Sequence, residues 1–328
     1  MPLVSVIMIS HRDTPYVRLA VRSVWEQTLP DLELIYVDNG SGMTPESLGA
    51  LGQDPRLHWI TLEKNYGIPI GMNTALNAAQ GEYIAVLDSD DIALPQRFEK
   101  QVAALRSNPK LGAVFSRADT IDEAGTVIGK EFTLLSEQDH HLFSAYDMPA
   151  MTPTLLVRRE IMVQHPYREL FRVACDYDQF ARVADRNTVC ALPDVLTQYR
   201  RHQIQATVQQ RSLQILNACI VRLLTARRRA GCREDIEGIG NDLKPWIKSP
   251  PDLVTIYAFF AARSLLEGFA LLAVYFARKT LSASRTPRRI AAALRILLVA
   301  WWQNPRQFIL LTRMFFTGPL RTHALKTA

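Results

Sequence analysis

The chain has 328 residues, of which 48% are hydrophobic, and a formal net charge of +6. This apolar content suffices for a buried core and excludes a disordered chain, while glycine and proline are too rare for a collagen-like one. The four cysteines lack zinc-site spacing and are too few for a disulfide scaffold, which predicts free thiols in a reducing, cytoplasmic compartment.

Charge divides the chain into two parts. Residues 1–210 carry 19 basic and 26 acidic side chains, whereas residues 211–328 carry 19 basic and 6 acidic ones. No acidic residue follows Glu267. We therefore expect a domain over 1–210 and a basic, apolar helical region over 211–328, each with its own partners.

The first part predicts strands and helices in alternation. Apolar, β-branched runs indicate buried strands, and apolar residues at helical spacing indicate the helices between them. In chain order we expect strands over 4–9, 32–37, 57–62, 82–87 and 111–115, with helices after Thr14, over 70–79 (ended by Gly81) and after Pro95. Repeated units of this kind predict an α/β fold with a mostly parallel sheet.

Parallel sheets bind ligands beyond the carboxyl ends of their strands. Three polar clusters fall at that edge, and they are Ser10 to Arg12, Asp38-Asn39 and Asp88 to Asp91. No glycine-rich dinucleotide motif follows the first strand and no P-loop motif occurs, which disfavours a dehydrogenase and a P-loop NTPase.

The acidic cluster Asp88-Ser89-Asp90-Asp91 is the most informative local feature. Its carboxylates repel one another unless a cation or solvent relieves them. Mg²⁺ binds through one or two carboxylates plus substrate phosphates, so Asp90, with Asp88 through water, would hold a divalent ion against a nucleotide diphosphate. The alternative is a solvated turn in which Asp91 caps the next helix.

The motifs, in this order, resemble the family 2 glycosyltransferases. The resemblance covers roughly residues 3–205 and rests on VSVIMISHR, LELIYVDNGS, NYGIPIGMNTALNAAQGEYIAVLDSDD, ACDYDQFARVAD and LPDVLTQYRRH. It implies a GT-A-type nucleotide-diphospho-sugar transferase domain. It also implies an inverting, hexosyltransferase-type activity that depends on Mn²⁺ or Mg²⁺.

The resemblance also implies roles for single residues. Asp176 matches the catalytic base, and the start of the helix that follows it favours an ionised carboxylate. Asp90 and His202 match metal-binding positions. The nucleotide-sugar-binding residues that it implies are Ser10, His11, Asp38, Asn65, Gly67, Asp88, Ser89 and Asp91. A turn or helix cap is the alternative for Asp38, and a helix N-cap is the alternative for Asp176. Asn65 and Gly67 could instead form a purely structural turn, and His202 could be a structural or solvated residue.

Two residues depart from the family pattern. Met72 stands where many relatives carry arginine, and Cys175 stands where glutamate is usual. They keep open a catalytically inactive nucleotide-sugar-binding scaffold, which the intact Asp88, Asp90 and Asp176 argue against. A processive synthase is disfavoured because no Q-x-x-R-W motif occurs.

Residues 211–328 predict helices near a membrane. Residues 253–277 are apolar and long enough to span a bilayer, but Arg263 and Glu267 would each cost about 2.5–3.5 kcal/mol to insert. An amphipathic helix is expected over 213–230 and shorter apolar helices over 290–302 and 308–316, and paired arginines lie at 288 and 295 and at 306 and 313. This pattern favours interfacial helices on an anionic membrane over a plain helical subdomain or an oligomer interface. The density of apolar residues argues against nucleic acid.

Together these features predict a transferase that moves a sugar from a nucleotide-diphosphate donor, with a UDP-sugar favoured. The expected acceptor is a hydroxyl of a glycan or lipid-linked molecule in cell-surface polysaccharide synthesis. The expected location is peripheral, on the cytoplasmic face of a membrane.

Overall fold

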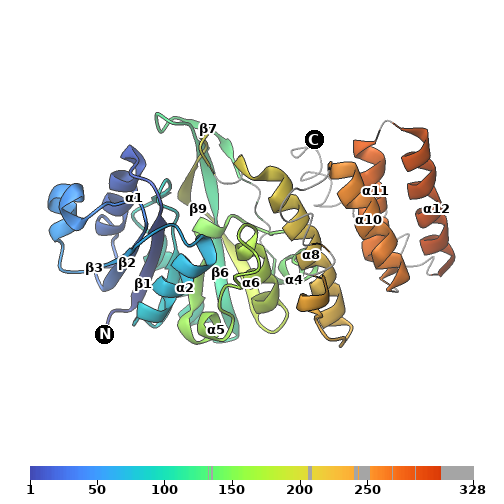
Figure 1. Cartoon of the computed structure of the whole chain (residues 1–328). Coiled ribbons are helices and arrows are strands. Elements are labelled where there is room, and N and C mark those ends of the chain that lie inside the picture. The colour runs from blue at the N-terminus through green and yellow to red at the C-terminus, as the bar shows by residue number, and fades with distance from the viewer. Residues whose placement is uncertain are drawn as a thin grey trace. The chain divides into compact units, whose positions relative to one another are not determined.

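The computed structural model describes residues 1–303 except 132, 134–135, 206–208, 240–242, 244–251, 268 and 285. Contacts divide the chain into two units, Met1–Gln209 and Gln210–Ala328. Figure 1 traces the elements of each along the chain.

The first unit is built on a nine-stranded sheet in the order β3-β2-β1-β4-β8-β6-β9-β5, with β7 paired to β6. Its strands are β1 Val4–Ser10, β2 Leu32–Asn39, β3 Leu57–Leu62, β4 Tyr83–Val86, β5 Ile92–Ala93, β6 Leu111–Ile121, β7 Val127–Lys130, β8 Leu156–Arg158 and β9 Thr188–Arg200. Strands β3, β2, β1 and β4 are mutually parallel, as the alternating pattern predicts.

Helices cover both faces of this sheet, which is why the residues of its central strands are buried on both faces. They are α1 Pro15–Trp25, α2 Ile68–Ala78, α3 Arg97–Ser107, α4 Glu137–Phe143, α5 Arg159–Gln164 and α6 Cys175–Ala184, with 3-10 turns η1 Pro45–Gln53 and η2 Thr152–Thr154. The core formed with α1 and α3 takes alternate residues of β1, namely Val4, Val6 and Met8. The α2 helix packs on the other face, where Gly71 lies against Ile9.

The second half of the sheet is mixed. Strand β8 runs antiparallel between β4 and β6, and β6 then pairs with β9 in parallel. The antiparallel β8 brings the residues just before it, in η2, next to the end of β4. The acidic residues that follow β4 therefore face a segment more than 60 positions away in the sequence.

Gly81 does not end the helix that precedes it, as the sequence pattern suggested. The capping residue of α2 is Ala79, and Gly81 has no positive φ. A Cβ at position 81 would lie 2.5 Å from the Ser5 backbone nitrogen, so the glycine is needed where the chain passes close to β1.

The second unit contains α8 Arg211–Arg229, α10 Leu253–Leu266, α11 Ala270–Ala283 and α12 Pro287–Gln303. The apolar segment 253–277 is divided between α10 and α11, and within the described residues no helix is long and apolar enough to cross a bilayer. Glu267 at the end of α10 accepts hydrogen bonds from Arg227 and Arg263, which holds its charge inside the helical unit. The helix expected over 308–316 and the arginines at 306 and 313 lie outside the described residues.

Candidate active site

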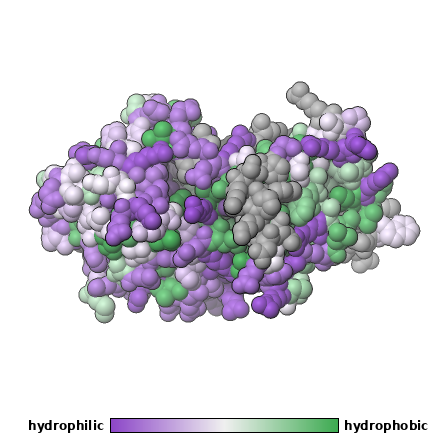
Figure 2. Space-filling model, viewed as in Figure 1, coloured by the Kyte–Doolittle hydropathy of each residue, from purple (hydrophilic) through white to green (hydrophobic). Residues whose placement is uncertain are grey.

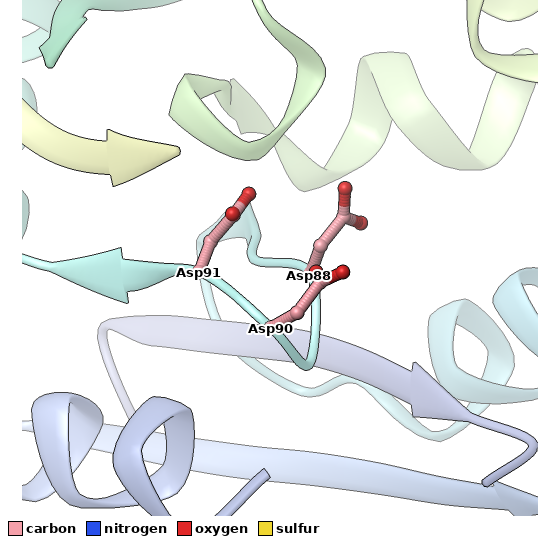
Figure 3. Close-up of side chains that lie close together, drawn as sticks. All are labelled: Asp88, Asp90 and Asp91. Carbon is pink, nitrogen blue, oxygen red and sulfur yellow. The ribbon is translucent and has the colours of Figure 1, made fainter. Parts of the chain in front are cut away.

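Three carboxylates project from the tight loop between β4 and β5 (Figure 3). Oxygen atoms of Asp88, Asp90 and Asp91 lie within 4.8 Å of one another. The loop starts where β4 ends, at the carboxyl edge of the parallel strands, so the sequence pattern placed the cluster correctly.

Each of these three residues has a different environment. Asp88 reaches solvent, Asp90 is half-buried, and Asp91 is fully buried. The backbone N–H of Arg200 donates to Asp91 Oδ1 over 2.7 Å, and the Arg200 guanidinium donates to the backbone oxygen of Asp90. Asp91 therefore fixes the end of β9 to the loop and does not cap α3, whose N-cap is Gln96. A contact between Asp91 and the donor sugar stays a prediction.

A second buried cation supports the loop from α3. Arg97 has no solvent exposure, and its guanidinium donates to the backbone oxygens of Val86 and Leu155 over 2.9 and 3.2 Å. Its Nε donates to Gln101, which in turn donates to the Thr154 backbone oxygen. Arg97 thus joins the last residue of β4 to the segment just after η2. The acidic loop follows β4, and η2 contains Thr152, which donates a hydrogen bond to Asp176.

His202 lies against the same loop. Its Nε2 is 2.7 Å from Asp90 Oδ2, and the ring packs on Tyr16 with centroids 5.2 Å apart. The imidazole is almost completely buried. The structure therefore brings together the two residues that the sequence predicted as metal ligands, from positions 112 apart in the chain.

The electrostatics of this cluster favour bound positive charge. Desolvation, with the charges of Asp90 and Asp176, raises the pKa of Asp88 to about 7 even though the residue reaches solvent. Burial, followed by the charges of Asp90 and Asp88, raises the pKa of Asp91 well above its ordinary value. A bound divalent cation reverses these effects because it stabilises the ionised form of each carboxylate.

The donor set fits Mg²⁺ or Mn²⁺. Carboxylate oxygens suit both ions, and an imidazole nitrogen is a common additional ligand for Mn²⁺ and other transition metals. Asp88 and Asp90 are open to a ligand, whereas Asp91 is enclosed. The residues that would hold the ion are accordingly Asp90 and His202, with Asp88 at the solvent side.

Asp176 lies in the first turn of α6. Its Oδ2 accepts a hydrogen bond from the Thr152 hydroxyl over 2.9 Å, and its Oδ1 accepts from the backbone N–H of Tyr177. The residue before the helix, Ala174, adopts the left-handed conformation with φ 58°, so the chain turns sharply at this point. The charge of Asp176 contributes to the raised pKa of Asp88, so the two carboxylates lie near each other.

Asp178, two residues further on, has a structural position. It is 1% exposed, and its carboxylate pairs with Arg182 at 2.9 Å and with Arg168 at 3.3 Å. Arg182 also donates to the backbone oxygen of Pro166. This ion-pair group fixes α6 to the segment that precedes it, and so fixes the start of the helix where Asp176 lies.

The loops after β1 and β2 lie side by side, because Ser10 pairs with Asp38 in the parallel register. Ser10 exchanges hydrogen bonds with the backbone of Arg12, and His11 is exposed. Asp38 is fully buried and accepts hydrogen bonds from Ser41 and from the Gly42 backbone N–H. The structure thus gives Asp38 the turn-capping contacts that were the alternative to nucleobase binding, and the nucleobase contact stays a prediction.

The loop before α2 is organised by Asn39, to which the sequence analysis assigned no role beyond its place in a polar cluster. The Asn39 side chain donates to the Gly67 backbone oxygen and to Asn65, and it accepts from the Tyr66 backbone N–H. Gly67 has φ +93°, which favours glycine. Asn65 and Gly67 therefore shape this loop, and their contact with the nucleotide stays a prediction. Asn39, Arg97 and Thr152 could have been suspected only from their places beside motif residues.

Comparisons with known proteins identify the family of the chain. Residues 5–164 match the model of glycosyl transferase family 2. An uncharacterized glycosyltransferase of Methanocaldococcus jannaschii is 32% identical over 206 residues, which are 61% of this chain and 71% of that protein. The amylovoran biosynthesis glycosyltransferase AmsE of Erwinia amylovora is 29% identical over 195 residues, 55% of this chain and 68% of that protein.

Solved structures show the same fold. TarS 1–349 of S. aureus, in complex with UDP-GlcNAc, matches with a TM-score of 0.55 and 15% identity over 95% of this chain and 84% of that chain. The mannosyltransferase PcManGT of Pyrobaculum calidifontis, in complex with GDP-Man and Mn²⁺, matches with a TM-score of 0.52 and 17% identity over 96% and 86%. The chain has a GT-A-type fold and belongs to glycosyl transferase family 2. It is a glycosyltransferase whose relatives include enzymes of polysaccharide biosynthesis.

Proposed function

We propose that the protein transfers a sugar, with inversion, from a nucleoside-diphosphate donor to a hydroxyl of a glycan or lipid-linked acceptor. The observation that carries this proposal is the placement of Asp176. Its carboxylate is held by Thr152 at the start of α6, and its charge acts on Asp88 of the acidic loop. A base and a diphosphate-binding loop in one site are what a direct displacement needs.

In the proposed reaction, Asp176 takes the proton from the acceptor hydroxyl as that oxygen forms a bond to the anomeric carbon. The bond from that carbon to the diphosphate oxygen breaks, and the nucleoside diphosphate leaves with the electron pair. A divalent ion, when bound at Asp90 and His202, supplies charge that stabilises the departing diphosphate. The hydrogen bond from Thr152 holds the Asp176 carboxylate in a fixed orientation at the start of α6.

A UDP-sugar is the favoured donor. TarS, which has the same fold, was solved with UDP and with UDP-GlcNAc, and PcManGT with GDP-Man and Mn²⁺. Polysaccharide biosynthesis is favoured by the names of relatives such as AmsE and the O-antigen glycosyltransferase WbnJ of Escherichia coli. Residues 211–328 are basic and contain no acidic residue after Glu267, which favours binding of the protein to the cytoplasmic face of an anionic membrane.

A thermal-shift panel tests this proposal. UDP-, GDP-, dTDP- and CMP-sugars are each added with and without Mn²⁺ or Mg²⁺, because a ligand that binds only the folded state raises its stability by mass action. At a concentration of about 100 Kd the gain is about 2.7 kcal/mol. We expect a metal-dependent shift with one nucleotide class, lost in Asp90→Ala. If no nucleotide shifts the folded protein, even with lipid extract present as acceptor source, the proposal fails.

The alternative, a nucleotide-sugar-binding scaffold without catalysis, rests on Met72 and Cys175. Both side chains are buried, Met72 in α2 and Cys175 at the start of α6. Turnover that disappears in Asp176→Asn while nucleotide binding persists excludes the scaffold. Binding in the wild type without turnover toward any acceptor in a glycolipid extract supports it.

A further inference from the structure

Helix α12 carries an apolar stripe on its exposed side. Leu294 is 48% exposed, Leu298 66% and Trp302 83%. These residues are four positions apart, so they lie along one face of the helix. Figure 2 shows hydrophobic residues on the visible surface of the second unit, bordered by hydrophilic ones. Exposed apolar residues gathered in this way mark a contact surface more often than isolated ones do.

The opposite side of the helix makes its contacts inside the unit. Helix α12 packs against α11 and α10, and Ala293 is buried there while Ile290 and Leu297 are half-buried. Arg289 borders this packed side and pairs with Asp252 of α10 at 3.1 Å. The stripe is therefore a second apolar side of a helix whose first apolar side is already used.

Positive charge accompanies the stripe. Arg288 and Arg295 are exposed, and at seven positions apart they lie on the same side as Trp302. Among the described residues no carboxylate pairs with either of them, in contrast to Arg289. We call the exposed residues Arg288, Leu294, Arg295, Leu298 and Trp302 the α12 face.

We propose that the α12 face lies on an anionic lipid surface, with its apolar side chains at the level of the headgroups and its arginines on lipid phosphates. The outer side of α12 carries apolar and aromatic side chains, and the charged side chains on it are positive. This is the composition of an interfacial helix. A second copy of the chain is a poorer partner, because it would set Arg288 and Arg295 against the same arginines with no carboxylate on the face. This inference rests on the proposed membrane location and specifies the surface responsible for it.

Vesicle sedimentation with the full-length protein tests the inference. The probes are vesicles of phosphatidylcholine alone and vesicles containing 30 mol% phosphatidylglycerol. We expect binding to the anionic vesicles only. Each arginine near an anionic surface contributes about fivefold to binding, so Arg288→Gln with Arg295→Gln should weaken partitioning roughly 30-fold at low salt. Leu298→Ser with Trp302→Ser should weaken it at least about tenfold.

A matched control comes from the first unit. Val127 and Ile128 of β7 are also apolar and are 51% and 58% exposed, but they are not on a basic helix. Val127→Ser with Ile128→Ser should leave vesicle binding unchanged. Nucleotide-sugar shifts in the thermal panel should be unchanged in all three double variants, so a failure of the proposed glycosyl transfer is distinguished from a failure at the α12 face.

Two results would overturn the inference. One is wild-type partitioning that does not depend on phosphatidylglycerol or on the α12 substitutions. The other is concentration-dependent self-association, measured by sedimentation velocity, that the α12 substitutions abolish without any vesicle binding by the wild type. The second result would show that the face binds another copy of the chain.

Discussion

Two aspartates two positions apart in α6 should respond oppositely to the same substitution. Asp178 is buried between Arg182 and Arg168, so Asp178→Asn removes the carboxylate that Arg182, which is 7% exposed, pairs with at 2.9 Å. Removing one member of a buried ion pair costs about 3–5 kcal/mol. For a domain of this size that cost lowers the melting temperature by about 6–20 °C.

Asp176→Asn should have the contrasting effect. The residue is half-buried and accepts two hydrogen bonds, of which an asparagine side chain can still accept one, so the loss of stability should be about 1 kcal/mol or less. An amide cannot take the acceptor proton, so turnover should fall about 10²–10⁴-fold. Asp178→Asn should keep measurable turnover at temperatures where it is folded.

The assay combines urea unfolding with release of nucleoside diphosphate from the donor found in the thermal panel. A second variant tests the cause of the stability loss, since Arg182→Met in the Asp178→Asn background removes the guanidinium that has lost the Asp178 carboxylate and should recover part of the lost stability. The reasoning is refuted if the free energy of unfolding of Asp178→Asn lies within about 1 kcal/mol of the wild-type value, which is the effect of a typical substitution. It is also refuted if Asp176→Asn keeps more than about a tenth of wild-type turnover.

Two further predictions concern buried charges. Arg97→Met removes the donors to the Val86 and Leu155 backbone oxygens and should lower the free energy of unfolding by about 2–6 kcal/mol. Arg158→Met, which removes bonds to two other backbone oxygens, is its control and should leave the Mn²⁺-dependent nucleotide shift unchanged, whereas Arg97→Met should reduce that shift. In the second unit, burial raises the pKa of Glu267 but hydrogen bonds from two arginines outweigh it, so the net pKa is lowered. The stabilising effect of the Glu267 carboxylate is therefore present above its unfolded pKa of 4.5 and lost as the pH falls through the folded value. In urea unfolding, Glu267→Gln should be less stable than wild type at pH 7, and the two should be equally stable at strongly acid pH.

Local patterns predicted much of the first unit. The strand over Leu57–Leu62 has the predicted bounds, and the first two strands extend only one or two residues further than expected. The acidic cluster falls at the predicted sheet edge, and the chain belongs to the family that its motifs resemble. These features depend on residues close together in the sequence, where apolar periodicity and motif spacing carry the information.

The tertiary structure decided the features that depend on contacts between distant segments. The antiparallel β8 places Thr152 beside Asp176. Arg97 becomes a buried support of the acidic loop only because Leu155 packs beside β4. The segment 253–277 is apolar and long enough to span a bilayer, yet it is divided between two helices. Glu267, between these helices, accepts a hydrogen bond from Arg227, 40 residues earlier in the chain. Periodicity reports which face of an element is apolar, but not which distant group will meet its polar residues, and that pairing exists only once the chain has folded.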